Sequence, residues 1–341
     1  MPGVDDGTRA EAARLHQAVL ALLPTGHDDP DLDRFTALMR DYPARGGKRV
    51  RGRLVLTSTA AHGGDPDGAL PVAAALELFQ NWVLVHDDIE DDSEERRGAP
   101  ALHRSVGVPI ALNVGDAMHV YMWDALIALE SRPAFDADAV RREFLWMIHR
   151  TAEGQHLDLA WVAEGRFDVG EEAYLAMVRR KTAAYTVVSP LRLGAYASGV
   201  PAHDDLASIG ERLGAAFQIR DDVLNLLPSE DGGYGKEFAG DLYEGKRTLV
   251  LAHALAHASR DEADEAIARL RPPRAERSED DVRWLLDLIT RVGSLRYAQS
   301  RAEALARAAL RELEDVLAPL PGRSAATTLL AALRDLTQRS A

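Results

Sequence analysis

The chain has 341 residues, of which 46% are hydrophobic, and its formal net charge is −14. It contains no cysteine, which excludes disulfides and thiolate metal sites. The acidic balance argues against nucleic acid as a general partner. No uncharged apolar stretch approaches about 18 residues, and the N-terminal sequence lacks the basic and apolar regions of a signal peptide. We therefore expect a cytoplasmic protein without a membrane span.

Helix-forming residues dominate the chain, and alternating β-branched runs are missing, which favours an all-α fold. Clusters of Gly and Pro separate the apolar periodic segments. The expected helices lie at about 8–23, 31–41, 48–62, 70–91, 108–130, 136–164, 171–180, 184–198, 203–227, 246–258, 260–270, 278–315 and 322–338. Because no repeat or composition shift marks a boundary, we expect one domain over residues 1–341.

The first segment that suggests chemistry is the basic turn RGGKRVRGR at residues 45–53. Gly46 and Gly47 let the backbone approach an anion, and a helix beginning near Lys48 would present its N-terminal N–H groups. Lysine and forked arginine donors suit diphosphate oxygens. The alternative is a solvated basic turn or a docking patch for acidic partners.

An apolar run at residues 72–85 leads directly into five acids within six residues. If the helix continues through them, Asp87 and Asp91 lie one turn apart on the same face, with Asp88 about 100° around. Carboxylates packed that closely repel one another, and a hard divalent cation such as Mg²⁺ removes the conflict. A solvated acidic helix end is the alternative interpretation.

Arg96 and Arg97 follow on the loop that leaves this acidic cluster. They could be simple counter-ions of the acids, an arrangement that contributes little to stability. Beside a metal–diphosphate site they would form a second anion clamp.

A second apolar helical run, at residues 213–219, ends in the pair Asp221 and Asp222. Two long apolar helices that both end in Asp-Asp are hard to explain as surface. Facing each other in a bundle, they would enclose a cavity with acids at its mouth and apolar walls below. Such a cavity suits a ligand with a phosphate head and a hydrocarbon tail.

Seven motifs in this order resemble those of the trans-isoprenyl diphosphate synthases, or polyprenyl synthetases. They are GGKRVR at 46–51, DDIED at 87–91, RRGAP at 96–100, GQHLDL at 154–159, KTA at 181–183, FQIRDD at 217–222 and GKEFAGDLYEGKRT at 235–248. The resemblance covers about residues 45–250. It implies the isoprenoid synthase fold, a homodimeric all-α bundle whose central cavity holds isopentenyl diphosphate and an allylic diphosphate.

The resemblance also implies roles for individual residues. About three Mg²⁺ ions per active site would be held by carboxylates, namely Asp87, Asp88, Asp91, Asp221, Asp222 and Asp241. Positive charge around the leaving diphosphate would come from Arg96, Lys181, Lys236 and Lys246. The diphosphate of isopentenyl diphosphate would be held by Gly47, Lys48, Arg51 and Arg97, with Gln80 nearby. Thr182 and Gln218 match positions beside the developing carbocation.

The implied reaction fits these residue types. Breaking an allylic C–O bond produces diphosphate and an allylic cation, and metals and bases lower the barrier by taking up the leaving charge. Apolar walls keep the cation from water until the double bond of isopentenyl diphosphate attacks it.

The sequence departs from the family pattern at two positions. Gly52 stands where the family usually has Pro, which should loosen a helix start. Asn225 replaces the last Asp of the second acid motif, keeping an oxygen ligand but losing one charge.

Product length is implied by the residues four and five before the first Asp of the motif. Val83 is small and leaves room below the acids, whereas the bulky Trp82 could close the channel lower down or from the side. This combination is most like producers of geranylgeranyl diphosphate. Farnesyl or longer-chain synthases are the nearest alternatives.

Two other functions compete with this interpretation. A class I terpene cyclase needs only one diphosphate site, which leaves the basic turn and Arg97 unexplained. A non-catalytic subunit that binds a catalytic homologue should have lost metal ligands, but both acid pairs are present. A helical scaffold with an acidic surface would make the ordered motifs a coincidence.

Overall fold

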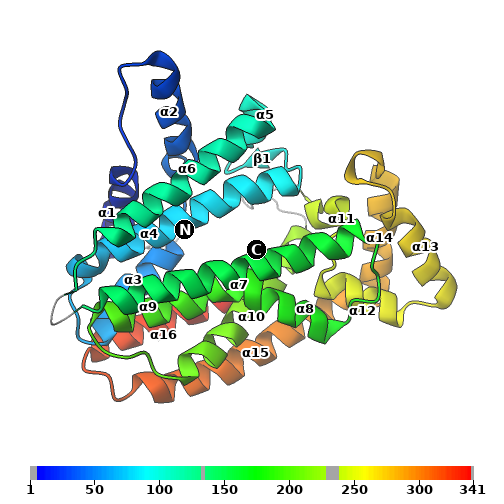
Figure 1. Ribbon diagram of the computed structural model, residues 1–341. Helices are drawn as coiled ribbons and strands as arrows, with labels where there is room; N and C mark the ends of the chain where they lie inside the picture. The colour runs from blue at the N-terminus through cyan, green and yellow to red at the C-terminus, as the bar shows by residue number, and fades with distance from the viewer. Residues whose placement is uncertain (1–5, 132–134, 228–237, 339–341) are drawn as a thin grey trace. The chain divides into compact units, whose positions relative to one another are not determined.

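A computed structural model describes residues 6–131, 135–227 and 238–338 (Figure 1). Nearly all of its regular structure is helical, so the all-α prediction is confirmed. The chain divides into two compact units: Met1–Trp146, Ser189–Leu206 and Asp315–Leu330 form the first, and Met147–Val188, Ala207–Glu314 and Ala331–Ala341 form the second. The expectation of one domain over residues 1–341 stays a prediction.

The elements that lie wholly in the first unit are α1 (Asp6–Ala21), α2 (Pro30–Ala44), α3 (Val50–Ala61), α4 (Pro66–Glu90), β1 (Glu95–Arg96), β2 (Ala99–Pro100), α5 (Leu102–Val106), α6 (Val108–Ile127) and α9 (Ser189–Ala197). Those of the second unit are α8 (Glu171–Val178), the π-helix η1 (Arg179–Val188), α11 (Gly240–Glu244), α12 (Leu249–His257), α13 (Arg260–Leu270), the 3₁₀ turn η2 (Arg274–Glu276) and α14 (Glu279–Arg291). Four helices contain a unit boundary: α7 (Ala137–Ala163), α10 (Asp205–Asn225), α15 (Ser294–Leu317) and α16 (Arg323–Gln338).

Helix α4 is the core of the first unit and packs against α1, α3 and α6. It starts where the side chain of Asp65 accepts hydrogen bonds from the backbone N–H groups of Asp67 and Gly68, with Pro66 in the first turn. Its length and hydropathy would allow it to cross a membrane, but 61% of its apolar window is buried within the protein. Such burial is the property of a core helix.

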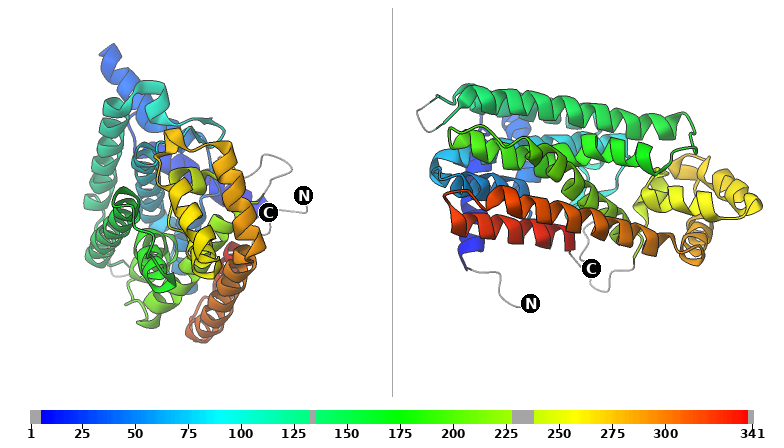
Figure 2. Two further views of the ribbon diagram at one scale, coloured as in Figure 1. Left: turned by 90° about the vertical axis from the view of Figure 1, so that its right-hand side faces the viewer. Right: turned by 90° about the horizontal axis from the view of Figure 1, so that it is seen from below.

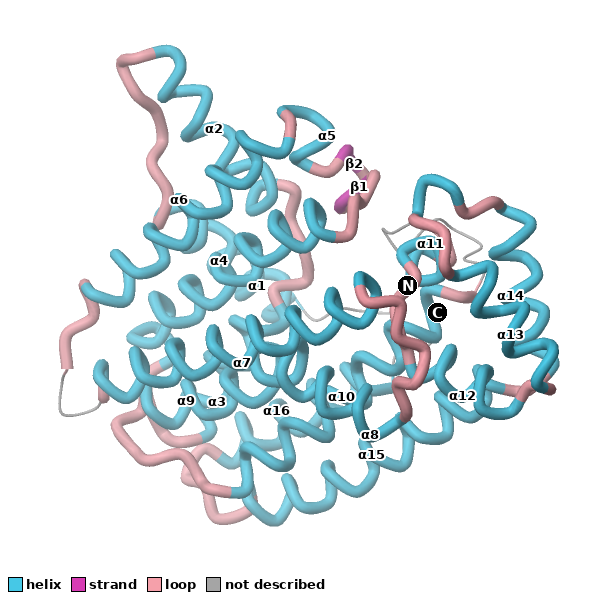
Figure 3. Tube along the Cα trace, turned by 45° about the vertical axis from the view of Figure 1, so that its right-hand side comes forward, coloured by secondary structure: helices cyan, strands magenta, loops and turns pink. Residues whose placement is uncertain are grey.

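A short hairpin, which the sequence pattern does not predict, follows α4 (Figure 3). Its two strands pair Glu95 with Pro100 and Arg96 with Ala99. Arg97 and Gly98 form the turn, and both have positive φ angles, of 56° and 75°. A two-residue turn with two such angles matches the twist of the flanking strands.

In the second unit, α12, α13 and α14 pack against one another and appear as one group in yellow and orange (Figure 2). The single helix expected at 278–315 is wrong, because Gly293, with φ 76°, separates α14 from α15. The break expected between 180 and 184 is also absent. The chain there runs without interruption through α8, η1 and α9.

Neighbouring helices approach the π-helix η1 closely, and glycines lie at the points of contact. A Cβ on Gly154 would lie 2.2 Å from the backbone nitrogen of Lys181, and one on Gly214 would lie 2.4 Å from Cα of Ala183. Only glycine permits such contacts. Long π-helical segments are rare and often mark functional sites, and η1 carries Lys181 and Thr182.

Gly52 does not loosen the start of a helix. Helix α3 begins at Val50, and Gly52 lies buried in its first turn, where its N–H donates to Oε1 of Glu77 at 2.8 Å. A Cβ here would lie 2.5 Å from a methyl group of Leu15 and 3.1 Å from the carbonyl oxygen of Ala73. The backbone N–H at position 52, which a proline would lack, is therefore used in a hydrogen bond. The space that a proline ring would need is already filled by Leu15 and the backbone of Ala73.

We predict that Gly52→Pro, which restores the usual family residue, destabilises this protein. Removing the N–H takes away the donor of Oε1 in the buried Glu77 carboxylate and leaves it Arg49 as its ion-pair partner, at a cost of about 2–3 kcal/mol. Thermal unfolding of Gly52→Pro and Gly52→Ala measures the effect, because Ala keeps the N–H and adds only the steric conflict. Equal melting temperatures of the two variants would contradict a role for the hydrogen bond.

Candidate active site

The two carboxylates of the first acid pair, Asp87 and Asp88, have different surroundings. Asp88 is fully buried, its Oδ1 accepts from Nε of Arg96 at 2.9 Å, and its Oδ2 accepts from the hydroxyl of Tyr42 at 2.6 Å. Asp87 is partly exposed, and its Oδ2 lies 3.6 Å from Nη2 of Arg96. Because both oxygens of Asp88 accept hydrogen bonds from the protein, Asp88 orients Arg96. Its role as a metal ligand, together with Asp87 and Asp91, stays a prediction.

Charge and burial explain why this arrangement stays ionised. Burial alone would lower the pKa of Arg96, but the Asp88 carboxylate raises it above its ordinary value. Burial and then the Asp88 charge raise the pKa of the Tyr42 hydroxyl, so it remains a donor. Arg96 is therefore a permanent cation at the base of the hairpin.

Arg97 points to different partners from its neighbour. Its Nη1 donates to the carbonyl oxygen of Tyr42 at 2.6 Å and to Oδ1 of Asn81 at 3.1 Å. A Cβ on Gly47, where φ is 131°, would lie 3.6 Å from the guanidinium carbon of Arg97. Burial, then the charge of Arg49, lowers the pKa of Arg97 to about 10. A bound anion would offset the repulsion between these positive charges and raise the pKa of Arg97 again.

The basic turn itself is only partly available to a ligand. Arg45 donates to the carbonyl oxygens of Arg96 and Pro100, at 2.9 and 3.0 Å, and Arg53 pairs with Glu11. Arg49 is buried and is the N-cap residue of α3, with a left-handed backbone conformation. Its side chain makes no capping hydrogen bond to the first turn of that helix. The predicted ligands lie around it: Lys48 is exposed, and Arg51 and Gln80 are half-buried.

The second acid pair is built in the same way. Asp222 is buried, and its two oxygens accept from the hydroxyl of Tyr174 at 2.6 Å and from Nε2 of Gln218 at 2.7 Å. The hydroxyl of Thr182 donates to Oε1 of Gln218 at 2.8 Å, so three predicted residues form one hydrogen-bonded chain. Asp221 is half-buried beside them.

Among the described residues, no arginine pairs with Asp222. Burial raises the pKa of Asp222 to about 6, the hydrogen bonds from Tyr174 and Gln218 oppose this shift, and the charge of Asp221 adds to it. The second pair is thus a place where added positive charge would be stabilising.

Asn225, the departure from the family motif, has a structural partner. Its Oδ1 accepts from the backbone N–H of Asp241 at 3.0 Å, and its carbonyl oxygen accepts from the N–H of Ala239 at 2.8 Å. Asn225 therefore positions the segment that carries Asp241, another predicted metal ligand. An amide oxygen serves this purpose without an added negative charge.

The predicted lysines of the second unit pair with acids. Nζ of Lys181 contacts the buried Asp158, and Nζ of Lys246 lies 2.7 Å from Glu244. Lys236 lies outside the described residues. Asp158 is a site residue that the sequence interpretation missed, although it falls inside the GQHLDL motif.

Residues 33–289 match the family model of polyprenyl synthetase. The chain belongs to the polyprenyl synthetase family. It is therefore a prenyltransferase, a short-chain prenyl diphosphate synthase. The resemblance inferred from the motifs is confirmed.

Similar proteins cover most of the chain. The short chain isoprenyl diphosphate synthase of Methanothermobacter thermautotrophicus is 36% identical over 79% of this chain and 80% of its own. The geranylgeranyl diphosphate synthase of Saccharolobus solfataricus is 33% identical, with 83% and 84% covered. The geranylfarnesyl diphosphate synthase of Aeropyrum pernix is also 33% identical, with 85% and 88% covered.

A solved structure supports the fold. Geranylgeranyl pyrophosphate synthase from Corynebacterium glutamicum, complexed with isoprenyl diphosphate and magnesium, has a TM-score of 0.85 and 30% identity. It covers 99% of this chain and 100% of its own. The isoprenoid synthase fold is thereby confirmed.

The carboxylates fit a hard divalent cation of the kind bound in that family. The candidate ligands are oxygen donors only, which suit Mg²⁺ better than softer metals. Over 6–131, 135–227 and 238–338 no ready-made group of three His, Asp or Glu side chains could hold a metal. Mg²⁺ needs only one or two carboxylates when water and substrate phosphates complete its shell.

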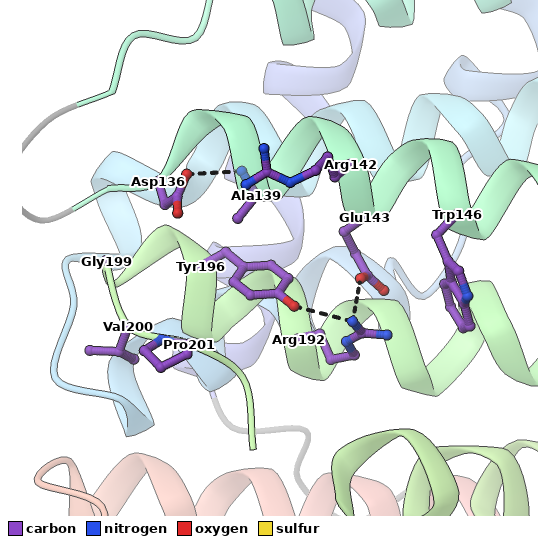
Figure 4. A pocket seen from close by; sticks show the side chains of 10 residues that line it. All are labelled: Asp136, Ala139, Arg142, Glu143, Trp146, Arg192, Tyr196, Gly199, Val200 and Pro201. Atoms are coloured by element: carbon purple, nitrogen blue, oxygen red, sulfur yellow. Dashed lines mark hydrogen bonds and ion pairs between the residues drawn. The ribbon is translucent and has the colours of Figure 1, made fainter. Parts of the chain in front are cut away.

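A separate cleft of about 560 Å³ lies between the first part of α7 and α9 (Figure 4). Within it, Arg192 pairs with Glu143 at 3.2 Å, donates to the hydroxyl of Tyr196 at 3.2 Å and stacks over Trp146. None of the predicted site residues lines this cleft. Of its charged groups, Glu143 and Arg192 already pair with each other.

We predict that Asp222→Asn stabilises the metal-free enzyme while it lowers activity. Because the folded pKa lies above the unfolded value of 3.8, this carboxyl contributes stability at acid pH, and the contribution is lost as the pH rises through about 6. The gain from Asn should therefore grow as the pH rises from about 4 to about 6 and then stay constant, on the order of 2–3 kcal/mol. Gln218 can turn its amide to pair with Asn.

Thermal unfolding in chelator between pH 5 and 8 measures this gain. Asp158→Asn is the control, because it also neutralises a buried carboxylate but removes the negative charge that pairs with Lys181. A gain that is independent of pH would contradict the assignment to Asp222.

Proposed function

We propose that the enzyme condenses isopentenyl diphosphate with an allylic diphosphate, and that its main product is geranylgeranyl diphosphate. The observation that carries the two-substrate part is the pair Arg96 and Arg97. These neighbouring cations have separate partners, Asp88 for the first and Tyr42 with Asn81 for the second. Two anion clamps one residue apart favour a synthase over a cyclase, which needs one.

The enzyme's own groups would act on the allylic diphosphate in the following way. Arg96, Lys181 and Lys246 would take up charge as the C–O bond breaks. Bound Mg²⁺, about three ions per site, would neutralise the leaving diphosphate. Thr182 and Gln218, fixed by the hydrogen bond between them, would lie beside the allylic cation. In this proposal the metal-binding carboxylates are the six predicted from the sequence, namely Asp87, Asp88, Asp91, Asp221, Asp222 and Asp241.

The second substrate would be held from the basic turn. Gly47, Lys48, Arg51 and Arg97 would bind the diphosphate of isopentenyl diphosphate, with Gln80 nearby. Its double bond then attacks the cation, and a proton leaves to the released diphosphate. The low pKa of Arg97 supports this assignment, since a diphosphate would relieve the repulsion among the arginines.

The product length is proposed from the residues before the acid motif. Val83 is half-buried and small, so it would let a tail pass. The bulky Trp82 would close the channel lower down or from the side. A stop at twenty carbons is consistent with the names of the enzymes from Saccharolobus and Corynebacterium, and the Aeropyrum enzyme marks the longer alternative.

We also propose a cytoplasmic homodimer. Helix α6 exposes large apolar side chains that the first unit does not cover, among them Val120, which is 60% exposed, and Ile127, which is 68% exposed. Exposed apolar side chains on one helix are candidates for a contact site, and a two-fold dimer would bury the same face of both copies.

We predict that Arg97→Gln raises KM for isopentenyl diphosphate about 10–100-fold and leaves KM for the allylic primer within about threefold. Asp87→Ala should lower kcat for both substrates by about 10³-fold. Labelled isopentenyl diphosphate, Mg²⁺ and primers of five, ten and fifteen carbons measure these values, and chromatography sizes the products.

Arg53→Gln is the matched control, since this arginine of the same basic turn pairs with Glu11. Consumption of the primer without incorporation of isopentenyl diphosphate would overturn the synthase proposal in favour of a cyclase. No reaction with any primer, in folded protein, would favour the non-catalytic subunit.

We predict that Val120→Asp converts a dimer into a monomer. In a two-fold dimer the new carboxylate would be buried against the same carboxylate of the other copy. Burying these unpaired charges costs several times the free energy that the apolar contact of Val120 contributes. Light scattering after size-exclusion chromatography measures the mass. Leu32→Asp, the same exchange at an exposed leucine of α2, should leave the mass unchanged. A monomeric unsubstituted protein would refute the dimer.

A further inference from the structure

Two histidines of α12 lie one helical turn apart in the second unit. His253 and His257 are the only histidines of the sequence that are separated by three or four residues. Residues at this spacing lie on the same face of a helix. Their imidazole rings stack, with centroids 3.9 Å apart and an interplanar angle of 12°. The helix thus brings the two rings together at the spacing that the ligand histidines of helical zinc sites have.

Each ring is fixed through its Nδ1 atom. Nδ1 of His257 lies 2.9 Å from the carbonyl oxygen of His253, and because a carbonyl only accepts, this nitrogen carries the proton. Nδ1 of His253 lies 2.9 Å from the hydroxyl oxygen of Ser294, at the start of α15. A histidine that binds a metal through Nε2 has its other nitrogen held by an oxygen in the same way. The Nε2 atom of His257 therefore has a lone pair to offer.

A second aromatic ring holds His253 in place. Tyr297 stacks on its imidazole with centroids 4.1 Å apart, and since two rings cannot share one face of an imidazole, His253 lies between His257 and Tyr297. The hydroxyl of Tyr297 donates to the carboxylate of Glu171, which also pairs with Arg301. The orientation of His253 is thus set by contacts from α12 and α15 together.

The Nε2 atoms of the pair are open to a ligand. In the part of the chain that the structure describes, neither Nε2 has a hydrogen-bond or ion-pair partner. His257 is exposed and His253 is half-buried, so an ion can reach them from solvent. Burial, then the charge of His257, lowers the pKa of His253, and the charge of Glu171 opposes this shift. The lowered pKa favours the neutral imidazole, which is the form that binds a metal.

We propose that His253 and His257 form a binding site for a borderline divalent metal ion such as Zn²⁺, separate from the carboxylates that would bind Mg²⁺. Imidazole nitrogens suit Zn²⁺, Cu²⁺ and Ni²⁺, whereas Mg²⁺ prefers oxygen ligands. The described residues supply no third His, Asp or Glu ligand, so water would complete the shell and the site would be an open one. Because the two ligands must stay one turn apart, a bound ion would stabilise α12 as a helix.

Electron paramagnetic resonance of bound Cu²⁺ tests the ligand set, because imidazole nitrogens split the spectrum and carboxylate oxygens do not. The full chain is titrated with Cu²⁺ while excess Mg²⁺ occupies the carboxylates of the candidate active site. The unsubstituted protein should show the splitting of two nitrogens. His257→Ala should weaken binding by more than about 100-fold, since one of two ligands is lost. Ser294→Ala should weaken it by about 10–100-fold, because Nδ1 of His253 loses its partner.

His149→Ala is the matched control, because it removes an exposed histidine of α7 that has no histidine three or four residues away. It should leave both the affinity and the spectrum unchanged. Equal weakening in His149→Ala and His257→Ala, or a spectrum with one nitrogen, would show scattered binding to single histidines and overturn the site. Displacement of Cu²⁺ by Mg²⁺ would overturn it as well.

Thermal unfolding tests the stabilisation of α12. Free Zn²⁺ at about 100 times its Kd should raise the melting temperature of the unsubstituted protein by about 3–6 °C. The same Zn²⁺ concentration should have a smaller effect on His257→Ala, and an equal rise in both proteins would overturn the inference. His257 is exposed, so its removal leaves the fold intact even if His253→Ala fails to fold. None of these measurements depends on prenyl transfer, so the proposed function is tested separately.

Discussion

The first half of the candidate site depends on one buried ion pair, that of Asp88 with Arg96. Taking two charges out of water is costly unless each finds several partners, and removing either partner would leave an uncompensated charge. Tyr42 makes the pair tolerable, because its hydroxyl donates to Asp88 and accepts from the N–H of Leu102, while its carbonyl oxygen holds Arg97. One residue of α2 thus fixes both arginines of the hairpin.

The described part of the second unit repeats this design without an arginine. A tyrosine hydroxyl, from Tyr174, again donates to the second aspartate of the pair, and Gln218 takes the other oxygen. Neutral donors offset burial only in part, so the pKa of Asp222 rises to about 6, whereas Asp88 has a full positive charge beside it. The two similar motifs therefore differ in charge. Asp88 pairs with a cation of the protein itself, Arg96, whereas Asp222 would be stabilised most by a cation that binds together with the substrate.

Much of the fold and the chemistry could be predicted from the sequence, because both depend on local sequence patterns. Helical periodicity gave the all-α class, and acids one turn apart indicated a metal site near Asp87 and Asp91. The roles of Asp88 and Asp222 could not be predicted, since their tyrosines lie 46 and 48 residues away in the chain. The π-helix η1 was missed because it depends on glycines of other helices. Asn225 was interpreted as a weakened ligand for the same reason: its partner, the N–H of Asp241, lies beyond the reach of a motif.

Product length differs from the chemistry in how it is encoded. Residues that take up charge must be particular side chains at particular spacings, so they stand out as motifs in any member of the family. Residues that bound an apolar tail need only a suitable volume, so no motif marks them. Two relatives that are both 33% identical to this chain carry the names of geranylgeranyl and geranylfarnesyl diphosphate synthases. Identity at this level therefore fixes the chemistry of the family and leaves the length of the product open.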